Sequence, residues 1–345
     1  MSEFLRNNWF VVVIAVIIIA FVSYFIYDEN KYNVSAKSDS DGNQVVASID
    51  KKDITANDIY DQPAPFDTAL LYNLYHNQIV DQSVKTTDDL DEKAKDLKKT
   101  IEQNVSSSSS QNSESQIETE LASFGYNGID QLYDYCLMTV KEAKMQRDYI
   151  EDHFDEVTPA LQENKPRTIS IISMQVQDLA ALTEDEQKKK DNIDSALSSG
   201  SFADAATAYS EDTATASDDG FYGYIDANSV NSQYSTLNAQ VIQAALNLEK
   251  DQTSDWIEVT DSSSGLKYLY KVHVDETDIQ SIWDSKNETV SNNILSAFLT
   301  ANQGLSVKIV QENAKDLDIE FKDEDVQKRI EDYINDQTGG NSNEE

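Results

Sequence analysis

The chain has 345 residues, of which 63 are acidic and 27 basic, and its formal net charge at pH 7 is −36. A surface of that sign repels nucleic acid, so DNA and RNA are excluded as expected partners, whereas basic client proteins are compatible with it. Hydrophobic residues make up 39% of the chain and aromatic residues 9%, which supports real hydrophobic cores in a chain long enough for two domains.

Cysteine and histidine are too few and too scattered for the common metal or redox sites. Cys136 is the only cysteine in the sequence, so no internal disulfide can form, and it falls on the apolar side of an expected helix. The histidines His76, His153 and His273 are far apart in the chain, which disfavours a zinc site. No stretch has the spacing of a calcium-binding loop. We expect no metal and no cofactor.

The first apolar segment predicts a membrane anchor at residues 9–27, which carry no charged side chain. A helix of that length nearly spans a hydrocarbon core of roughly 30 Å. Arg6 precedes the segment and acidic residues follow it, so residues 1–8 should stay in the cytoplasm as a short stub. The protein is then a single-pass protein of the cell membrane with most of its chain outside the cytoplasm. A cleaved signal peptide is the alternative, with "VSA" at residues 34–36 as a distant cleavage site.

The segment after the anchor begins with a polar linker, residues 28–44, and then becomes helical. The stretch "VVASIDKKDITANDIYD" predicts a short strand, a turn and a helix that starts at Thr55. A serine-rich stretch, "VSSSSSQNSESQ", predicts a mobile loop between later helices. Apolar residues at three- and four-residue steps predict helices over residues 67–84 and 88–104, from residue 117, and over 129–153.

The pattern changes at Arg167, where β-branched residues become dense. This predicts a compact α+β module at residues 166–275, between an N-terminal helical segment at 45–165 and a C-terminal helical return at 276–335. The two helical segments should pack together as one discontinuous domain, and residues 336–345 read as a disordered tail. Within the module we expect strands at 167–176, 221–225 and 266–274 and helices near 184–198, 202–209 and 238–248.

The module resembles the parvulin-type (PpiC) peptidyl-prolyl isomerases. "ALSSGSFADAATAYSEDTATASDDGFYGYI" is similar to the family's two helices, its "YSED" loop and its glycine-led strand. "AQVIQAALNLEKDQTSDWIEVTDSSSGLKYLYKV" is similar to the family's next helix, its turn and its closing strand. That resemblance implies an inserted module with a four-stranded sheet and helices, and so an α+β chain.

The flanking segments extend the resemblance to exported foldases of the PrsA and SurA type. "VASIDKKDITANDIY" and "LDIEFKDEDVQ" resemble the first and last parts of those proteins, so the likeness covers roughly residues 45–330. It implies a chaperone domain built from the N- and C-terminal segments, with unfolded or newly exported proteins as partners. A homodimer is an open alternative, since related foldases can dimerise. The chain departs from PrsA in having an apolar anchor in place of a lipid-modified cysteine.

The polar site of active parvulins carries over only in part. The family has two facing histidines and an Asp or Cys, which favour the twisted amide of an X-Pro bond over the planar one. Here the first histidine position falls on Ser170 and the second on Lys267, or on Tyr268 if the strand slips by one residue. Asp212, in "YSED", matches the third position. An alternative role for Asp212 is to cap a turn of its own loop.

The apolar walls of the proline pocket fall on Leu237 and Val241, with Leu246 and Tyr268 as further substrate-binding candidates. These side chains are smaller than the Met and Phe of the family, and both Leu237 and Val241 also fit a core role. With both histidines absent, we expect the module to keep the fold with weak or no isomerase activity.

Three functions remain open from the sequence. The favoured one is a foldase or chaperone that holds exported chains. The second is an active peptidyl-prolyl cis-trans isomerase. The third is a cell-surface scaffold that uses the module only to bind proteins.

Overall fold

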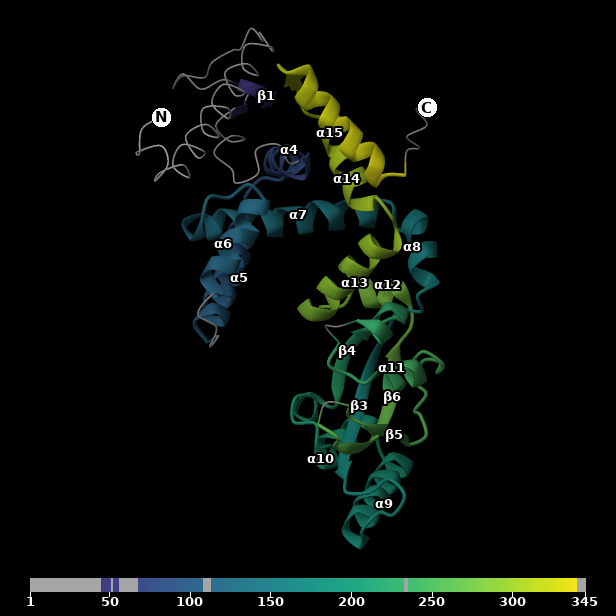
Figure 1. Cartoon of the computed structure of the whole chain (residues 1–345). Helices are drawn as coiled ribbons and strands as arrows, with labels where there is room; N and C mark the ends of the chain where they lie inside the picture. The colour runs from purple at the N-terminus through teal and green to yellow at the C-terminus, as the bar shows by residue number, and fades with distance from the viewer. Residues whose placement is uncertain are drawn as a thin grey trace, which may run out of the picture. The chain divides into compact units, whose positions relative to one another are not determined.

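The protein is described by a computed structural model over residues 45–50, 52–55, 68–107, 113–232, 235–262 and 264–339 (Figure 1). The expected stub, anchor and linker, residues 1–44, lie outside the described residues. Among the helices that are described, none is both long and apolar enough to cross a membrane. The chain divides into two compact units, one of residues 142–309 and one that combines residues before 142 with residues 310–336.

The first unit contains a small sheet in which strands from the beginning of the described chain pair with a strand near its end. Its strand order is β2-β1-β7, and both neighbours of β1 run antiparallel to it. In this sheet Ala47 is opposite Phe321 and Ile49 is opposite Ile319. Thr55 is the last residue of a strand and not the first of a helix, contrary to the prediction. The strands are β1 Val45–Ile49, β2 Lys52–Thr55 and β7 Ile319–Phe321.

The helices of the first unit pack around two sets of apolar side chains. Tyr72 of α4 stacks on Tyr333 of α15 with ring centroids 4.6 Å apart, which again joins the two chain ends. Cys136 is fully buried with Ala94 and Leu121, and burial raises the pKa of its thiol to about 11, so the thiol is a packing group. The helices are α4 Thr68–Ser83, α5 Asp88–Ser107, α6 Ser113–Ser123, η1 Ile129–Gln131, α15 Glu324–Gln337 and α7 Leu132–Asp152, whose residues from 142 on belong to the second unit.

One carboxylate ties three elements of the first unit together. Asp81 of α4 accepts hydrogen bonds from Lys141 of α7 at 2.8 Å and from Lys52 of β2 at 2.7 Å. The Lys141 side chain is only 4% exposed. Burial works against the charged form of Asp81, but the two lysines outweigh it and lower the pKa of this carboxyl.

Replacing Asp81 with asparagine should therefore destabilise the first unit by about 1.5 kcal/mol at neutral pH, because the buried Lys141 ammonium loses its counter-ion. A lowered pKa means that the stabilisation exists above the unfolded value, near pH 4, and is lost as the pH falls through the folded value. Urea unfolding at pH 7 and at acid pH checks this. A difference in unfolding free energy between the wild type and Asp81→Asn that stays constant down to about pH 3 would contradict this prediction.

The second unit contains the predicted α+β module, built on a four-stranded sheet of order β4-β3-β6-β5. All three strand pairs are antiparallel, and β3 pairs with β6 along its whole length. The sequence located β3 and β4 at their observed bounds and missed β5. The strands are β3 Arg167–Val176, β4 Phe221–Ile225, β5 Ile257–Thr260 and β6 Lys267–Glu276.

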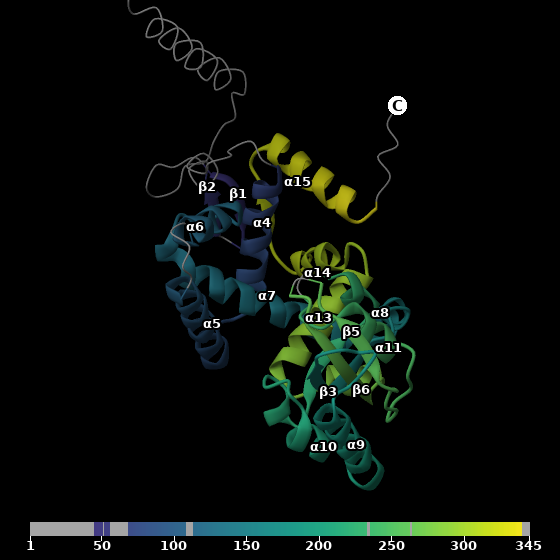
Figure 2. The ribbon, with the colours of Figure 1, turned by 60° about the horizontal axis from the view of Figure 1, so that its bottom comes forward.

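The two faces of this sheet carry different hydrophobic clusters. Ile169 and Ile171 belong to the cluster under α11, whereas Ile172 and Met174 belong to the cluster under α9 and α10. Figures 1 and 2 both place α11 apart from α9 and α10. The helices of the module are α9 Glu184–Ser199, α10 Phe202–Tyr209 and α11 Ala239–Ala245, with short turns η2 Ala216–Asp218 and η3 Ala227–Asn231.

Helices from both sides of the module complete the second unit. Trp283 and Phe298 meet edge to face, with ring centroids 5.3 Å apart, and Phe154 packs against both. The Arg147 guanidinium lies over the Trp283 ring, 5.1 Å from its centroid. These helices are α8 Phe154–Gln162, α12 Ile279–Trp283, α13 Glu288–Ala301 and the first half of α14 Leu305–Ala314, up to residue 309.

Candidate functional site

The alternation of β3 decides which polar residues can share a site. Successive side chains of a strand point to opposite faces, so Ser173 shares the α11 face with Ile169 and Ile171. Ser170 shares the other face with Ile172. The side chains of the two serines of "TISIIS" therefore lie on opposite faces of the sheet.

Ser170 is placed on the α9/α10 face and is only 7% exposed. Its hydroxyl donates to the Asp275 carboxylate, with the nearer oxygen at 2.9 Å. Its cross-strand partner is His273, whose ring stacks on Phe202 and whose Nδ1 lies 2.9 Å from Thr253 Oγ1. Burial raises the pKa of Asp275, and the bond from Ser170 only partly offsets it.

Lys267 lies at the other end of β6 and faces a different partner. Its ammonium pairs with Asp178 at 3.0 Å, and its backbone is opposite Val176. Six steps of β6 separate Lys267 from His273, the partner of Ser170, which is about 20 Å at ~3.3 Å per residue. Ser170 and Lys267 therefore do not form one site.

Asp212 lies in a loop that is hydrogen-bonded to the backbone of β3 at Ser173. The neighbouring Glu211 donates its N–H to the Ser173 carbonyl at 2.8 Å, and the Ser210 hydroxyl accepts the Ser173 N–H at 3.2 Å. The Asp212 carboxylate accepts the Ala214 N–H at 3.0 Å, which is the turn-capping role considered from the sequence. The structure thus brings Asp212 to Ser173 and not to Ser170 or Lys267.

Opposite this loop, β6 presents two tyrosines to the same face. Ser173 is directly across from Tyr270, and the Tyr268 and Tyr270 rings are tilted with centroids 6.0 Å apart. Tyr222 of β4 packs against the same cluster, and its hydroxyl lies 3.2 Å from Thr236 Oγ1. We call Tyr268 and Tyr270 the tyrosine patch; both are half-buried.

The hydroxyls of Tyr268 and Tyr270 form no hydrogen bond with any of the described residues. Burial, followed by the negative charge of Asp212, raises the pKa of Tyr270. The phenol therefore remains protonated at neutral pH and can donate to an incoming carbonyl. The tyrosine patch is thus a surface of ring faces with free donors.

The expected apolar walls lie beneath this patch. Leu237 is 7% exposed and Val241 is fully buried, so both belong to the core as the structure stands. Leu246 is half-buried and packs against the same cluster. Of the four substrate-binding candidates, Tyr268 is the one that forms part of the tyrosine patch.

Sequence reasoning missed Ser173 and Tyr270. The missing information was the register, since Ser173, and not Ser170, is hydrogen-bonded to the "YSED" loop. Both faces of β3 are buried, so the polar residues around Ser170 do not alternate with apolar ones in a way that separates the two faces.

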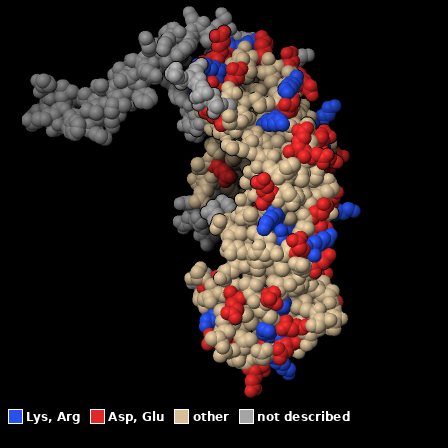
Figure 3. Space-filling model, turned by 90° about the vertical axis from the view of Figure 1, so that its right-hand side faces the viewer, with Lys and Arg blue, Asp and Glu red and all other residues tan. Residues whose placement is uncertain are grey.

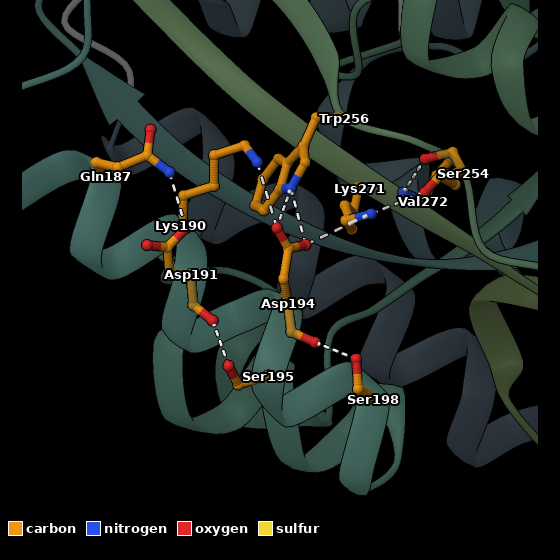
Figure 4. A network of polar contacts seen from close by, with 10 residues as sticks. All are labelled: Gln187, Lys190, Asp191, Asp194, Ser195, Ser198, Ser254, Trp256, Lys271 and Val272. Atoms are coloured by element: carbon orange, nitrogen blue, oxygen red, sulfur yellow. Dashed lines mark hydrogen bonds and ion pairs between the residues drawn. The ribbon is translucent and has the colours of Figure 1, made fainter.

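The opposite face of the sheet has a hollow of about 600 Å³ bounded by α9, α10 and β6. A polar network at its edge joins α9 to the sheet, and Figure 4 shows it. Trp256 Nε1 donates to the Asp194 carboxylate at 2.9 Å. The ammonium groups of Lys190 and Lys271 lie 5.4 and 5.3 Å from the centroid of the Trp256 ring. These contacts satisfy one another, and we assign them a structural role.

No group of three or more His, Cys, Asp or Glu side chains able to hold a metal ion occurs among the described residues. The arrangement on the α11 face can bind a peptide through rings, hydroxyls and one carboxylate. It has no imidazole, since His273 lies on the other face.

Comparison with known proteins identifies the module. Residues 172–269 match the family model described as rotamase, PPIC-type PPIASE domain. The parvulin-type resemblance predicted from the sequence is thereby confirmed for this part of the chain. The match begins one residue before Ser173. No curated protein matches the chain.

Several solved structures are similar over most of the chain. The foldase protein PrsA from Streptococcus pneumoniae is 18% identical with a TM-score of 0.41, over 81% of this chain and 96% of that one. PrsA from Bacillus subtilis is 19% identical with a TM-score of 0.41, over 83% and 98%. The foldase protein PrsA from Lactococcus lactis is 15% identical with a TM-score of 0.42, over 84% and 99%.

Proposed function

Starting from the PPIC-type module that the family match identifies at residues 172–269, we propose that this protein is a foldase or chaperone for exported proteins, anchored in the cell membrane by residues 9–27. The module then acts on the outer side of the membrane. The observation that carries the proposal is the family match, together with the tyrosine patch on the face that the "YSED" loop borders. The discontinuous helical segments provide a second surface for holding an unfolded chain.

We further propose that the module binds proline-containing segments with weak or no catalysis. Rotation about an X-Pro bond has a barrier of about 18–20 kcal/mol and is slow without help. The two positions opposite one another next to Asp212 are Ser173 and Tyr270, and neither has an imidazole. A serine and a phenol can hydrogen-bond a carbonyl but do not provide the family's pair of rings.

An active isomerase is the second candidate, and the donor hydroxyls of Tyr268 and Tyr270 beside Asp212 favour it. Two preorganised donors next to a carboxylate could stabilise a twisted amide without histidine. A non-catalytic scaffold is the third, and it differs from the first in having no effect on client folding.

Exchange NMR on an X-Pro peptide with the full chain tests the catalytic half of the proposal. We expect a cis–trans exchange rate close to the uncatalysed rate, because the imidazoles are absent. A clear acceleration of cis–trans exchange that disappears in Asp212→Ala would show instead that the module is an active isomerase. Suppression of aggregation of an unfolded client, measured by light scattering in parallel, separates a chaperone from a scaffold, since only a chaperone should delay aggregation.

A further inference from the structure

Carboxylates lie at two sides of the tyrosine patch and come from different loops. Asp212 is in the loop bound to Ser173, the residue opposite Tyr270. Asp261 opens the β5–β6 turn, where its N–H donates to the Leu266 carbonyl at 2.8 Å. Since Val259 is opposite Tyr268, this turn is next to the second ring. The negative charges of both Asp212 and Asp261 also act on Tyr270 and help to raise its pKa.

These two carboxylates are held in place by backbone groups. Asp212 Oδ1 accepts the Ala214 N–H, and Asp261 Oδ1 accepts both the N–H and the hydroxyl of Ser264. Glu211, one residue from Asp212, is different, because it pairs with Lys189 and accepts the Gln175 N–H. Asp212 has no Lys or Arg partner among the described residues. Its charge is therefore available to a ligand.

Aromatic ring faces next to carboxylates are a favourable environment for a guanidinium or ammonium group. The rings attract a cation through their π-electrons, and the carboxylates add charge and hydrogen bonding. The net charge of −36 adds attraction at longer range, and Figure 3 shows acidic side chains spread over the drawn face among fewer basic ones. An acidic peptide meets repulsion from every one of these groups.

We infer that the tyrosine patch, with Asp212 and Asp261 at its sides, selects proline-containing client segments that carry a lysine or arginine within one or two residues of the proline. The proline ring packs on the tyrosine rings, and the cation lies between a ring face and a carboxylate. This inference rests on the proposed function, in which the α11 face binds the client.

The test compares short disordered peptides with a central Ala-Pro that differ only in one neighbour, which is arginine, its neutral analogue citrulline or glutamate. Binding to the full chain is measured by calorimetry at low salt and at about 0.15 M salt. We expect the arginine peptide to bind about five- to tenfold more tightly than the citrulline peptide at low salt, with a smaller difference at the higher salt. The glutamate peptide should bind most weakly.

The double variant Asp212→Asn/Asp261→Asn keeps the side-chain oxygens that accept the backbone bonds and removes both charges. It should reduce the preference for arginine over citrulline to less than about twofold. The matched control is Glu184→Gln/Asp191→Asn, which makes the same change of charge at two exposed positions of α9, below the other face. It should leave the preference intact.

The other possible outcomes contradict the inference alone or the proposed function as well. A preference that persists in Asp212→Asn/Asp261→Asn, or falls equally in the α9 control, overturns the inference, because the charge of the whole surface would then explain it. Equal binding of all three peptides also overturns it but leaves the proposed function standing. Absence of binding by any peptide, with no NMR shifts at Tyr268 and Tyr270, overturns both.

Discussion

Replacing Gly220 with alanine should destabilise the module by about 3 kcal/mol. Gly220 has φ = +84°, and a Cβ added there would lie 2.6 Å from Ala206 Cβ and 2.9 Å from the Ile171 carbonyl oxygen. The left-handed backbone costs a non-glycine residue about 1 kcal/mol, and displacing two packed elements costs a further 1–3 kcal/mol. The glycine is the point at which the loop carrying Asp212 passes between α10 and β3.

Hydrogen exchange of the β3 and β6 amides in the full chain measures this loss, because these strands are at the centre of the module. Gly265→Ala is the matched control. Gly265 also has a positive φ, +72°, but a Cβ there meets nothing within 4 Å, so it should show only the backbone cost of about 1 kcal/mol. Equal losses in the two variants would show that the close contacts at Gly220 relax freely.

Introducing the double substitution Ser173→His/Tyr270→His should raise isomerase activity by about tenfold to a hundredfold. The two positions are directly opposite one another on β3 and β6, so their Cβ atoms are roughly 5 Å apart, close enough for the rings to face each other. Ser173 is only 4% exposed, so its replacement by the larger histidine needs space. The replacement of Tyr270 by the smaller histidine provides that space. Asp212 remains beside the pair. Exchange NMR on an X-Pro peptide measures the gain and confirms that the variant is folded.

Ser170→His provides the control, because Ser170 is opposite the natural His273. That single change also creates two facing imidazoles, but on the α9/α10 face. We expect no gain in activity from it. Activity gained by Ser170→His and not by the double variant would mean that the catalytic face had been assigned to the wrong side of the sheet.

The difference between Ser170 and Ser173 shows where sequence reasoning reached its limit. Residues 167–176 were predicted as a strand at the observed bounds, because β-branched residues are dense there. Both faces of that strand are buried, so its polar and apolar residues do not alternate. Without alternation, the sequence could not assign Ser170 and Ser173 to faces, and cross-strand pairing was needed.

The elements that were missed are short and mixed in composition. β2, "KDIT", and β5, "IEVT", each have four residues and combine charged with apolar side chains. Such strands form because a neighbouring strand, β1 for β2 and β6 for β5, has a free edge to pair with. The residues of the short strand alone do not reveal that pairing. The helices predicted near 184–198 and 202–209 are present as α9 and α10, and in the structure each begins after a side chain that caps it, Thr183 and Ser201.

The pairing of β3 with β6 has a consequence for the removal or exchange of the module. The module begins at Arg167 and ends at Glu276, and Glu276 is opposite Thr168. Paired residues on antiparallel strands are about 5 Å apart. A deletion of the whole module would therefore leave two chain ends that a very short peptide can rejoin, but α12 and α13, which contact β3 and β4, would lose part of their packing. A module exchanged into this position would have to preserve the surfaces of β3 and β4 on which α12 and α13 pack.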